Sequence, residues 1–467
     1  MNNINTIKIL EKICGDDGVI TDLAEVQVYD QDWDKKFNNR SICVVLPRNK
    51  NEVSQIVKFC NDNLIKIIPQ GGNTGLVAGA NPTATNQEII LNLKKMNKIK
   101  ELDKFNLSIE LEAGVILQKL KEKCERENLY FPIEITSSGS SQIGGNIASN
   151  AGGMNAIKFG SMRDQLLGLE VITADGSIIN VNNKMRKNNM GYDLKHLFCG
   201  SEGTLGIITA ATLKLYPLPK KKVSVLLAYN NISSLLKSYL EIRNELSDLI
   251  ESCEFFTNIS FEIVNKNSPI SKKFFSQAYP YYLLMRLTSS SYYINLEHIV
   301  TSFLDKRKKY ADVIVPINKT QENEFWNFRE MLSENQKKEG HVIHNDISVP
   351  INELETLLDD VRKKISNIDE KCILHSFGHL GDSNIHMNVI FDSKKKDLNN
   401  FEYMVTEIIN EKVIDLGGSI SAEHGIGVIK KISFLKYTNN INVEIMKKIK
   451  KLLDPNNIMN PNKVFDA

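Results

Sequence analysis

Polar side chains gather near the C-terminus of this 467-residue chain, in two groups that are close in sequence. Two imidazoles and one carboxylate are a frequent ligand set for a divalent metal, and one further histidine could then act as a base. The residues are His379, Asp382, Asn384, His386 and Asn388, followed by the adjacent pair Glu423 and His424. This part of the chain therefore indicates a metal-assisted reaction.

The first group predicts a strand, a Gly-Asp turn and a returning strand. In the returning strand the side chains alternate: Asn384, His386 and Asn388 share one face, while Ile385, Met387 and Val389 take the other. We expect the polar face to line a cavity. Taken singly, each histidine fits an ordinary core or surface position, and only the pair, joined by Glu423, favours a ligand role.

The N-terminal half carries a different signal, three glycine-rich segments at 69–75, 139–153 and 200–206. Successive glycines let backbone N–H groups turn outward and surround a phosphate. None of the segments is a Walker P-loop or a strand, G-x-G-x-x-G, helix unit. Any one of them could be a set of tight turns. The run 144–153, however, has too few bulky residues to pack a core, so we expect a large ligand against it.

Composition limits the function classes. The 58 basic and 56 acidic residues leave a net charge of +2, so no global field favours nucleic acid or an anionic membrane. The length predicts two or more domains, and 42% apolar residues suffice to fill them. The chain shows neither a long apolar span nor the features of a signal peptide, so a cytoplasmic location is expected. Its seven cysteines form no C-x-x-C pair, which disfavours an iron–sulfur cluster.

Small helices and strands alternate along the first half. Apolar periodicity predicts a helix over 50–63 with a cap at Asn51, and another over 115–128. Strands are expected at 65–68, 89–93, 108–112 and 207–215, and a hairpin at 167–173 and 177–181. The stretch 132–160 reads as one long loop. Pro217 and Pro219, followed by a lysine triplet, indicate a domain boundary.

In order and spacing, the segments Pro69 to Gly75, Gly139 to Gly153 and Gly200 to Ile207 resemble the FAD-binding domain of the vanillyl-alcohol oxidase and p-cresol methylhydroxylase superfamily. The C-terminal half resembles the FAD-linked oxidase domain of the D-2-hydroxyacid dehydrogenases, a group that includes D-2-hydroxyglutarate and D-lactate dehydrogenases and the glycolate oxidase flavoprotein subunit. The implied fold class is α+β, with a two-subdomain FAD-binding domain and an α+β substrate domain. The expected parts are an N-terminal extension (1–37), the FAD-binding domain (38–219) and the substrate and metal domain (220–467), whose last 50 or so residues return to the flavin.

The resemblance implies a set of FAD-binding residues in the three glycine-rich segments. They are Pro69, Gly71, Gly72, Asn73, Thr74, Gly75, Gly139, Ser140, Gly144, Asn146, Ser149, Asn150, Gly152, Gly153, Glu202, Gly206 and Ile207. Some relatives have a histidine in the first loop that bonds covalently to the flavin. This chain has Asn73 there, and because an amide is not a nucleophile, non-covalent FAD is expected.

In the second half the resemblance implies that His379, His386 and Glu423 bind zinc or a similar divalent metal, and that Asp382 only forms the turn. His424 is the expected base: it takes the hydroxyl proton while hydride leaves C2 for flavin N5. Its alternative is a structural loop histidine.

The substrate carboxylate also needs an anchor, and the resemblance assigns it to Arg329, whose planar fork suits a carboxylate. Ser333, one turn later, is expected to add a hydroxyl, and Asn388 a further substrate contact. The alternative for Arg329 is a surface salt bridge to Glu330 or Glu334.

One departure from the family pattern concerns the substrate. Many relatives have a lysine, which is thought to meet the distal carboxylate of a dicarboxylic substrate, where this chain has His344; Arg286 is a candidate replacement. D-2-hydroxyglutarate remains the leading substrate, with D-lactate or another D-2-hydroxy acid as alternatives.

Two further readings remain open. The chain could be a subunit of a glycolate or lactate oxidase that relies on iron–sulfur partners, or an idle FAD- or metal-binding scaffold. The expected electron acceptor is an electron-transfer flavoprotein or a quinone. A homodimer is also possible by family analogy.

Overall fold

The computed structural model describes residues 3–268, 274–392 and 397–466, and the chain divides into two compact units. The first unit contains Met1–Gly152, Gly160–Pro217 and His424–Ala467; the second contains Gly153–Phe159 and Leu218–Glu423. The chain leaves the first unit between Pro217 and Leu218, close to the predicted proline boundary. It returns at His424, so the C-terminal segment is counted with the first unit.

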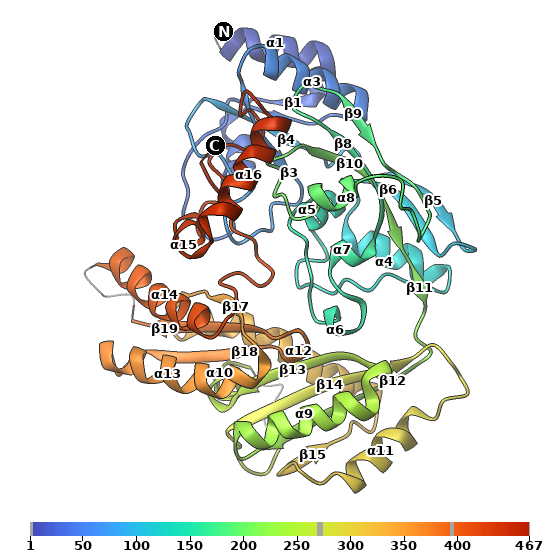
Figure 1. Ribbon diagram of the computed structural model, residues 1–467, viewed down its shortest axis with the longest axis vertical. Coiled ribbons are helices and arrows are strands. Elements are labelled where there is room, and N and C mark those ends of the chain that lie inside the picture. The colour runs from blue at the N-terminus through green and yellow to red at the C-terminus, as the bar shows by residue number, and fades with distance from the viewer. Residues whose placement is uncertain (1–2, 269–273, 393–396, 467) are drawn as a thin grey trace. The chain divides into compact units, whose positions relative to one another are not determined.

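The first unit has two main sheets (Figure 1). One has the strand order β1 (Val19–Ile20), β2 (Val44–Val45), β4 (Glu88–Asn92), β3 (Lys66–Gln70), and β4 is parallel to both of its neighbours. The other is antiparallel, in the order β5 (Ile99–Asp103), β6 (Ser108–Glu112), β10 (Ile207–Lys214), β8 (Leu166–Ile172), β9 (Ile178–Asn180). A short pair, β7 (Leu129–Tyr130) and β11 (Tyr216–Pro217), lies apart from them. The predicted strands and the hairpin of β8 and β9 are confirmed.

Several helices of the first unit contribute apolar residues to the core around these sheets. The helices of this unit are α1 (Asn3–Cys14), α2 (Leu23–Asp30), α3 (Lys50–Asp62), α4 (Leu117–Arg126), α5 (Ile143–Ala148), α7 (Met162–Gln165), α8 (Leu194–Phe198), α15 (Lys431–Tyr437) and α16 (Asn440–Leu453). In α3, Val53, Ile56, Val57 and Cys60 are buried at helical spacing, as predicted. The cap prediction is wrong by two residues: the Asn49 side chain accepts from the N–H groups of Asn51 and Glu52.

Two sequence predictions for this unit need correction. Residues 1–37 are not a mere extension, because Leu10 and Cys14 of α1 lie fully inside the main core. The stretch 132–160 is not one loop, because it contains α5 and α6 (Ala156–Phe159). Glycine is a poor helix former, but in α5 a side chain at Gly144 would come within 2.7 Å of Ala113 Cβ. Close packing against Ala113 therefore outweighs glycine's low propensity.

The described residues of the second unit form one antiparallel sheet of eight strands (Figure 1). Along its main path the order is β15 (Asp312–Ile314), β12 (Lys221–Tyr229), β14 (Tyr281–Ser289), β13 (Ile250–Thr257), β18 (Ile373–His379), β19 (Asn384–Phe391), β16 (His341–Ile343), and β17 (Asp346–Ser348) pairs with β19. The other helices of this unit are α9 (Ile232–Leu246), α10 (Asn258–Asn267), α11 (Leu296–Lys306), α12 (Lys319–Asn335), α13 (Leu354–Ile368) and α14 (Leu398–Asp415).

The two faces of this sheet have different covers, because side chains alternate along each strand. Tyr229 of β12 donates its hydroxyl to Ser238 of α9. The next residue back, Ala228, belongs to the aromatic core formed with α10 and α12. That core includes Phe325, Phe328 and Leu332, at positions i, i+3 and i+7 of α12. The sequence of α12 thus fixes which of its side chains face the strands that carry the polar residues.

In the part of the chain that the structure describes, no helix is long and apolar enough to cross a membrane.

Candidate functional site

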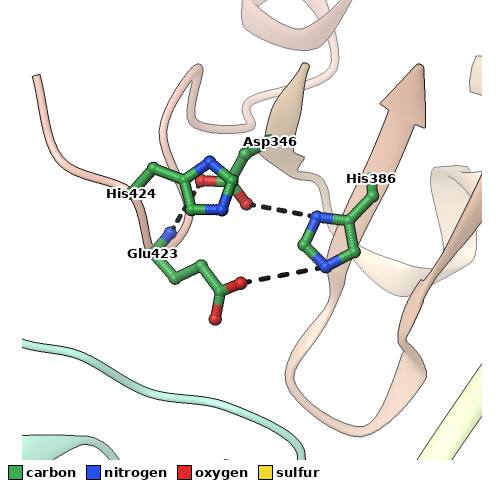
Figure 2. A group of neighbouring side chains, drawn as sticks. All are labelled: Asp346, His386, Glu423 and His424. Atoms are coloured by element: carbon green, nitrogen blue, oxygen red, sulfur yellow. Dashed lines mark hydrogen bonds and ion pairs between the residues drawn. The ribbon is translucent and has the colours of Figure 1, made fainter. Parts of the chain in front are cut away.

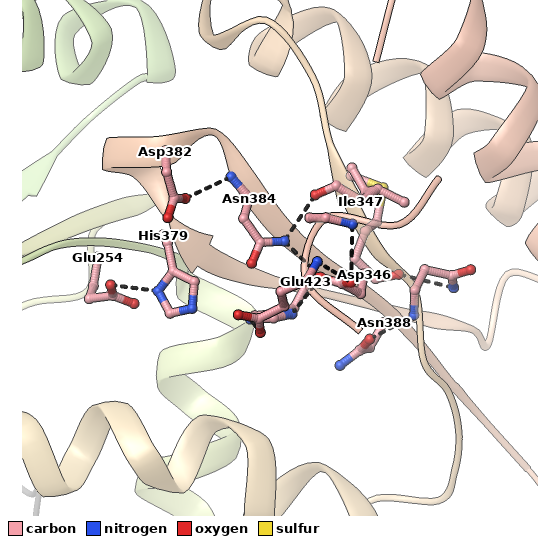
Figure 3. A network of polar contacts seen from close by, with 12 residues as sticks. Glu254, Asp346, Ile347, His379, Asp382, Asn384, Asn388 and Glu423 are labelled. Atoms are coloured by element: carbon pink, nitrogen blue, oxygen red, sulfur yellow. Dashed lines mark hydrogen bonds and ion pairs between the residues drawn. The ribbon is translucent and has the colours of Figure 1, made fainter. Parts of the chain in front are cut away.

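The hairpin of β18 and β19 presents the polar face predicted from the sequence (Figure 3). In its antiparallel register Phe377 lies opposite His386, and His379 opposite Asn384. A short 3-10 turn at Leu380–Asp382 and the left-handed Ser383, with φ +66°, reverse the chain. Asp382 accepts a hydrogen bond from the Asn384 N–H at 3.2 Å. The predicted strand, turn and strand are therefore confirmed, and Asp382 closes the turn.

His386 lies between two carboxylates (Figure 2). Its Nδ1 is 3.8 Å from Asp346 Oδ1, and its Nε2 is 3.8 Å from Glu423 Oε1. Asp346 is placed there by β17, where it pairs in register with His386. One ligand atom from each of the three residues lies within 4.8 Å of the others, a spacing that could accommodate a metal ion. Figure 2 also draws His424, which follows Glu423 directly in the sequence.

Asp346 is buried and its carboxylate is already engaged by the chain. It accepts hydrogen bonds from the backbone N–H groups of Ala422, at 3.2 Å, and Glu423, at 3.0 Å, and from the Asn384 amide at 2.8 Å. These bonds fix the backbone that carries Glu423. Asp346 thus orients the loop that carries Glu423. It also lies on the Nδ1 side of the His386 ring, whereas Glu423 lies on the Nε2 side.

His379 has a carboxylate partner of its own, Glu254 of β13 (Figure 3). The His379 Nδ1 lies 2.7 Å from Glu254 Oε1, and Glu254 has no exposed surface. Burial lowers the pKa of His379, but the Glu254 charge outweighs it and raises the pKa to about 9. His379 lies outside the group around His386, although the two ring centroids are 5.4 Å apart. The predicted triad is thus brought together only in part.

A second histidine on the same face of β18 shows the ordinary alternative. His375 is fully buried, its Nε2 lies 3.0 Å from the Leu332 carbonyl oxygen, and burial lowers its pKa to about 4. It is a neutral core histidine. The contrast with His379 comes from Glu254, because a facing carboxylate stabilises the imidazolium form.

Arg329 extends from α12 to the same carboxylate. Its Nε donates to Glu254 Oε2 at 2.5 Å, and the centre of its guanidinium lies 5.0 Å from the centroid of the Phe377 ring. Only 5% of Arg329 is exposed. The alternative of a surface salt bridge to Glu330 or Glu334 is therefore wrong: Arg329 is buried and pairs across the unit with β13.

Of the two remaining predicted substrate contacts, Asn388 is already bonded within the chain through its side chain. Asn388 accepts from the Asn345 N–H at 3.1 Å and donates to Gln336 Oε1 at 2.8 Å. The Ser333 carbonyl oxygen accepts from the Gln336 side chain at 2.8 Å. Asn388 and Ser333 thus share Gln336 as a neighbour, which places β19 and the end of α12 together.

In the first unit, the loop after β3 combines a glycine in a tight contact with a glycine beside open space. A side chain at Gly72 would come within 2.1 Å of the Ser140 carbonyl oxygen, so this position requires glycine. Side chains added at Gly75, Gly139 and Gly145 would meet nothing within 4 Å. Within the described residues, the N–H groups of 72–75 donate no hydrogen bond. Such a row of unused amides fits a phosphate ligand.

Comparison with known proteins identifies both halves. The family model for the C-terminal domain of FAD linked oxidases matches residues 218–464, and the FAD binding domain model matches 41–182. The chain is 33% identical to the mitochondrial D-2-hydroxyglutarate dehydrogenase of Arabidopsis thaliana, across 98% of this chain and 81% of that protein. It is 31% identical to the D-2-hydroxyglutarate dehydrogenase of Xanthomonas citri pv. viticola, across 96% and 94%. The chain belongs to the FAD-linked D-2-hydroxyacid dehydrogenases.

Solved structures support the fold of this dehydrogenase. p-Cresol methylhydroxylase with substrate bound superposes with a TM-score of 0.79 at 14% identity, across 99% of this chain and 97% of that one. An alkyldihydroxyacetonephosphate synthase gives a TM-score of 0.76 at 17% identity, across 99% and 85%. The predicted α+β class is thus confirmed, and the fold is like that of p-cresol methylhydroxylase.

The residues predicted to bind FAD lie in the first unit of the dehydrogenase, with one exception. Gly153 is the first residue of the segment 153–159, which belongs to the second unit. Several of the predicted residues have structural roles within the chain. The Asn150 side-chain oxygen accepts from Ser161 and from the Arg163 N–H, both at 2.9 Å. The Glu202 carboxylate accepts from the N–H groups of Ile426 and Gly427, both at 2.8 Å. A side chain at Gly206 would come within 2.8 Å of Val171, so this glycine serves close packing.

Glu202 and Asp346 have similar roles in the two units of the dehydrogenase. Asp346 binds two successive backbone amides just before His424, and Glu202 binds two just after it. Burial raises the pKa of Glu202, and the two amides lower it in part. The loop that carries the expected base is therefore held on each side by a carboxylate, that of the buried Asp346 and that of the half-buried Glu202.

Sequence reasoning missed Asp346 and Glu254. Each is a buried acidic residue within a strand: Asp346 lies in β17, and Glu254 lies in β13 together with Glu251. A carboxylate in such a position costs free energy unless it is paired. An acidic residue in a buried strand therefore indicates that a partner exists, although the sequence does not say which residue that partner is.

Proposed function

We propose that this chain oxidises D-2-hydroxyglutarate to 2-oxoglutarate with non-covalent FAD and a divalent metal. Its relatives from a plant and a bacterium are named D-2-hydroxyglutarate dehydrogenases and match it over nearly its full length. The observation that carries the metal part is a repeated pairing. His379 and His386 each turn Nδ1 toward a buried carboxylate, Glu254 in one case and Asp346 in the other.

The side chains fit a metal of the zinc type. Histidine ligands commonly bind a metal through one ring nitrogen while the other nitrogen faces a carboxylate. On this pattern His379 and His386 would bind through Nε2 and Glu423 through its carboxylate, a set that leaves room for substrate. Asp346 is the orienting carboxylate, because backbone and amide donors already occupy it. Zinc or another divalent ion would suit this set.

The chain's own residues supply binding and proton transfer. When bound, the metal would polarise the C2 hydroxyl, and FAD would supply the acceptor for the hydride from C2. Arg329 binds the C1 carboxylate through its outer amino groups, since its Nε is engaged by Glu254. His424 takes the hydroxyl proton. Asp346 and Glu202 hold the loop on each side of His424, so the base starts from a fixed backbone.

FAD binding is supported by the loop after β3. The N–H groups of 72–75 are available to the pyrophosphate, and Gly75 leaves open space beside them. Asn73 is held by the chain: its amide donates to the Gln31 carbonyl oxygen at 2.8 Å. An amide in this position forms no covalent bond to flavin, so acid should release the cofactor.

A second substrate, D-lactate, is favoured by one observation. His344 is exposed between β16 and β17, where many relatives are expected to have a lysine for a distal carboxylate. The guanidinium of Arg286, the candidate replacement for that lysine, instead stacks 3.9 Å from the centroid of the Trp326 ring. Both acids share the carboxylate and hydroxyl that Arg329 and the metal would bind.

The electron acceptor, assembly and location are proposals of the same kind. We propose an electron-transfer flavoprotein or a quinone as acceptor, a homodimer, and a cytoplasmic location. Copurification would test the acceptor, sedimentation would test the homodimer, and cell fractionation would test the location.

Anaerobic titration with a panel of D- and L-2-hydroxy acids tests the function directly. We expect the flavin absorbance to bleach with D-2-hydroxyglutarate at the lowest concentration, with D-lactate at higher concentration, and not with the L-acids. Bleaching by no D-2-hydroxy acid would contradict the proposal. Equal bleaching by D- and L-acids would contradict its stereochemistry.

A further inference from the structure

A single buried carboxylate joins two groups of the proposed site. Glu254 accepts from His379 at one oxygen, Oε1, and from Arg329 at the other, Oε2, at 2.7 and 2.5 Å. Figure 3 shows the first of these contacts beside the polar face of β18 and β19. Glu254 has no exposed surface, and both partners are at least nine-tenths buried. Neither oxygen is therefore shared with bulk solvent.

We propose that Glu254 is a positioning residue that sets the metal ligand and the carboxylate anchor relative to each other. Bonding at Nδ1 leaves Nε2 of His379 as its ligand atom. Bonding at Nε leaves the two outer amino groups of Arg329 for the substrate. One side chain thus decides which atom of each partner faces the reactants.

The fold keeps Glu254 in this place from two directions. On the sheet, Glu254 of β13 lies in register opposite His379 of β18. From the helix layer, α12 brings Arg329 to the same point, because Phe328 beside it packs into the core with Phe256 and Phe377. The position of the carboxylate is therefore set by strand pairing and by apolar packing together.

This arrangement has a consequence for substrate class, which rests on the proposed function. Both groups bond to the two oxygens of one carboxylate, so they are held within the span of that group. Such closeness suits a substrate whose carboxylate and hydroxyl sit on adjacent carbons. A 2-hydroxy acid has this spacing, whereas a 3-hydroxy acid places one more carbon between them.

Glu251 offers a matched control in the same strand. It is also fully buried, and within the described residues neither of its oxygens has a hydrogen bond. Its nearest cation, Arg286 Nη1, is 3.9 Å away. Replacing Glu251 removes a buried charge from β13 without touching His379 or Arg329, so it reports the generic cost of such a change.

The experiment compares Glu254→Gln with Glu251→Gln in the full-length FAD-loaded protein. His379 and Arg329 bond to different oxygens of Glu254, and glutamine has an NH2 group in place of one of them, so one of the two partners loses its acceptor. Zinc is removed with a chelator and titrated back, and KM and kcat are measured for D-2-hydroxyglutarate and for 3-hydroxybutyrate. We expect Glu254→Gln to weaken zinc binding and raise KM for D-2-hydroxyglutarate, each by about 10- to 100-fold, the usual range for loss of an orienting partner.

The outcomes separate the inference from the proposed function. Wild-type zinc affinity and KM in Glu254→Gln, or equal losses in Glu251→Gln, would overturn the positioning role. If Glu254→Gln does not fold, Glu254→Asp takes its place, because it keeps the charge but is one methylene shorter. Weaker zinc binding or a higher KM in Glu254→Asp would support the positioning role. Wild-type zinc affinity together with a wild-type KM would overturn it. If wild-type protein oxidises no D-2-hydroxy acid, the proposed function fails, while the zinc titration still decides the role of Glu254.

Discussion

The glycine loop after β3 and the polar face of β18 and β19 are built in opposite ways. The loop offers backbone N–H groups, and its glycines serve close contact, as at Gly72, or open space, as at Gly75. The polar face offers side chains, and each histidine proposed as a ligand faces a second carboxylate behind it. The first region needs the absence of side chains, whereas the second needs pairs of them.

This difference decides what a substitution should do. A substitution of a loop glycine adds a Cβ atom, so its effect depends on whether that atom clashes with a neighbour or lies in open space. A change on the polar face acts through the orientation of a partner, so it should alter chemistry before it alters folding. Four predictions follow this contrast from the largest expected effect to the smallest.

His424→Ala should have the largest effect on chemistry. Loss of a general base lowers kcat by about 10²- to 10⁴-fold, and steady-state kinetics with D-2-hydroxyglutarate measures it. FAD content should stay at the wild-type level. His298→Ala, on the exposed side of α11, is the control. A wild-type kcat in His424→Ala would mean that this histidine is only a loop residue.

Asp346→Asn should weaken metal binding by about 10- to 100-fold, because asparagine keeps one acceptor where Asp346 serves two backbone amides, the Asn384 amide and the His386 ring. Zinc titration of the chelator-treated protein measures it. Asp382→Asn is the matched control, because Asp382 is an exposed carboxylate of the neighbouring turn and lies outside the group around His386. Equal zinc affinity in the two variants would remove Asp346 from the account.

The glycine loop provides a paired test. Gly72→Ala should lower the free energy of unfolding by about 1–3 kcal/mol, as overpacking does, because its Cβ would lie 2.1 Å from the Ser140 carbonyl oxygen. Gly75→Ala meets nothing within 4 Å and should leave the apoprotein as stable as wild type. Thermal melts of both apoproteins, with FAD titrations alongside, separate the two. If Gly75→Ala binds FAD as tightly as wild type, the cofactor does not lie against this glycine.

The last prediction concerns Asn73 and involves the smallest effect: with an amide at this position, the flavin should have no covalent link to the protein. Acid precipitation should release all the flavin into the supernatant, where its absorbance is read. Flavin that stays with the precipitate would show that another residue forms a bond. Asn73→Ala is the control: it lacks the amide and should also release all its flavin, as expected if Asn73 forms no bond to the cofactor.

The sequence predicted the elements better than the partners. Apolar periodicity placed α3, β6 and the β18 and β19 hairpin, because burial repeats every few residues and leaves a local record. It failed at 132–160, where Gly144 belongs to a helix that forms through packing against Ala113. That contact joins distant parts of the chain, so no local pattern reports it.

The same reason explains the gaps in the site. His386 and Glu423 were found because their residue types suggest chemistry. Asp346 and Glu254 were missed because strand pairing, not spacing, brings them to the histidines. Arg329 was found, but its buried pairing with Glu254 depends on how α12 packs over the sheet.

The central claim is that side chains of the second unit hold a metal that the reaction requires. The most direct test is anaerobic flavin reduction by D-2-hydroxyglutarate in the double variant His386→Ala, Glu423→Ala, with zinc and FAD contents measured on the same sample. We predict FAD bound as in wild type, zinc absent and no bleaching of the flavin. Bleaching at the wild-type rate by the zinc-free double variant would contradict the account.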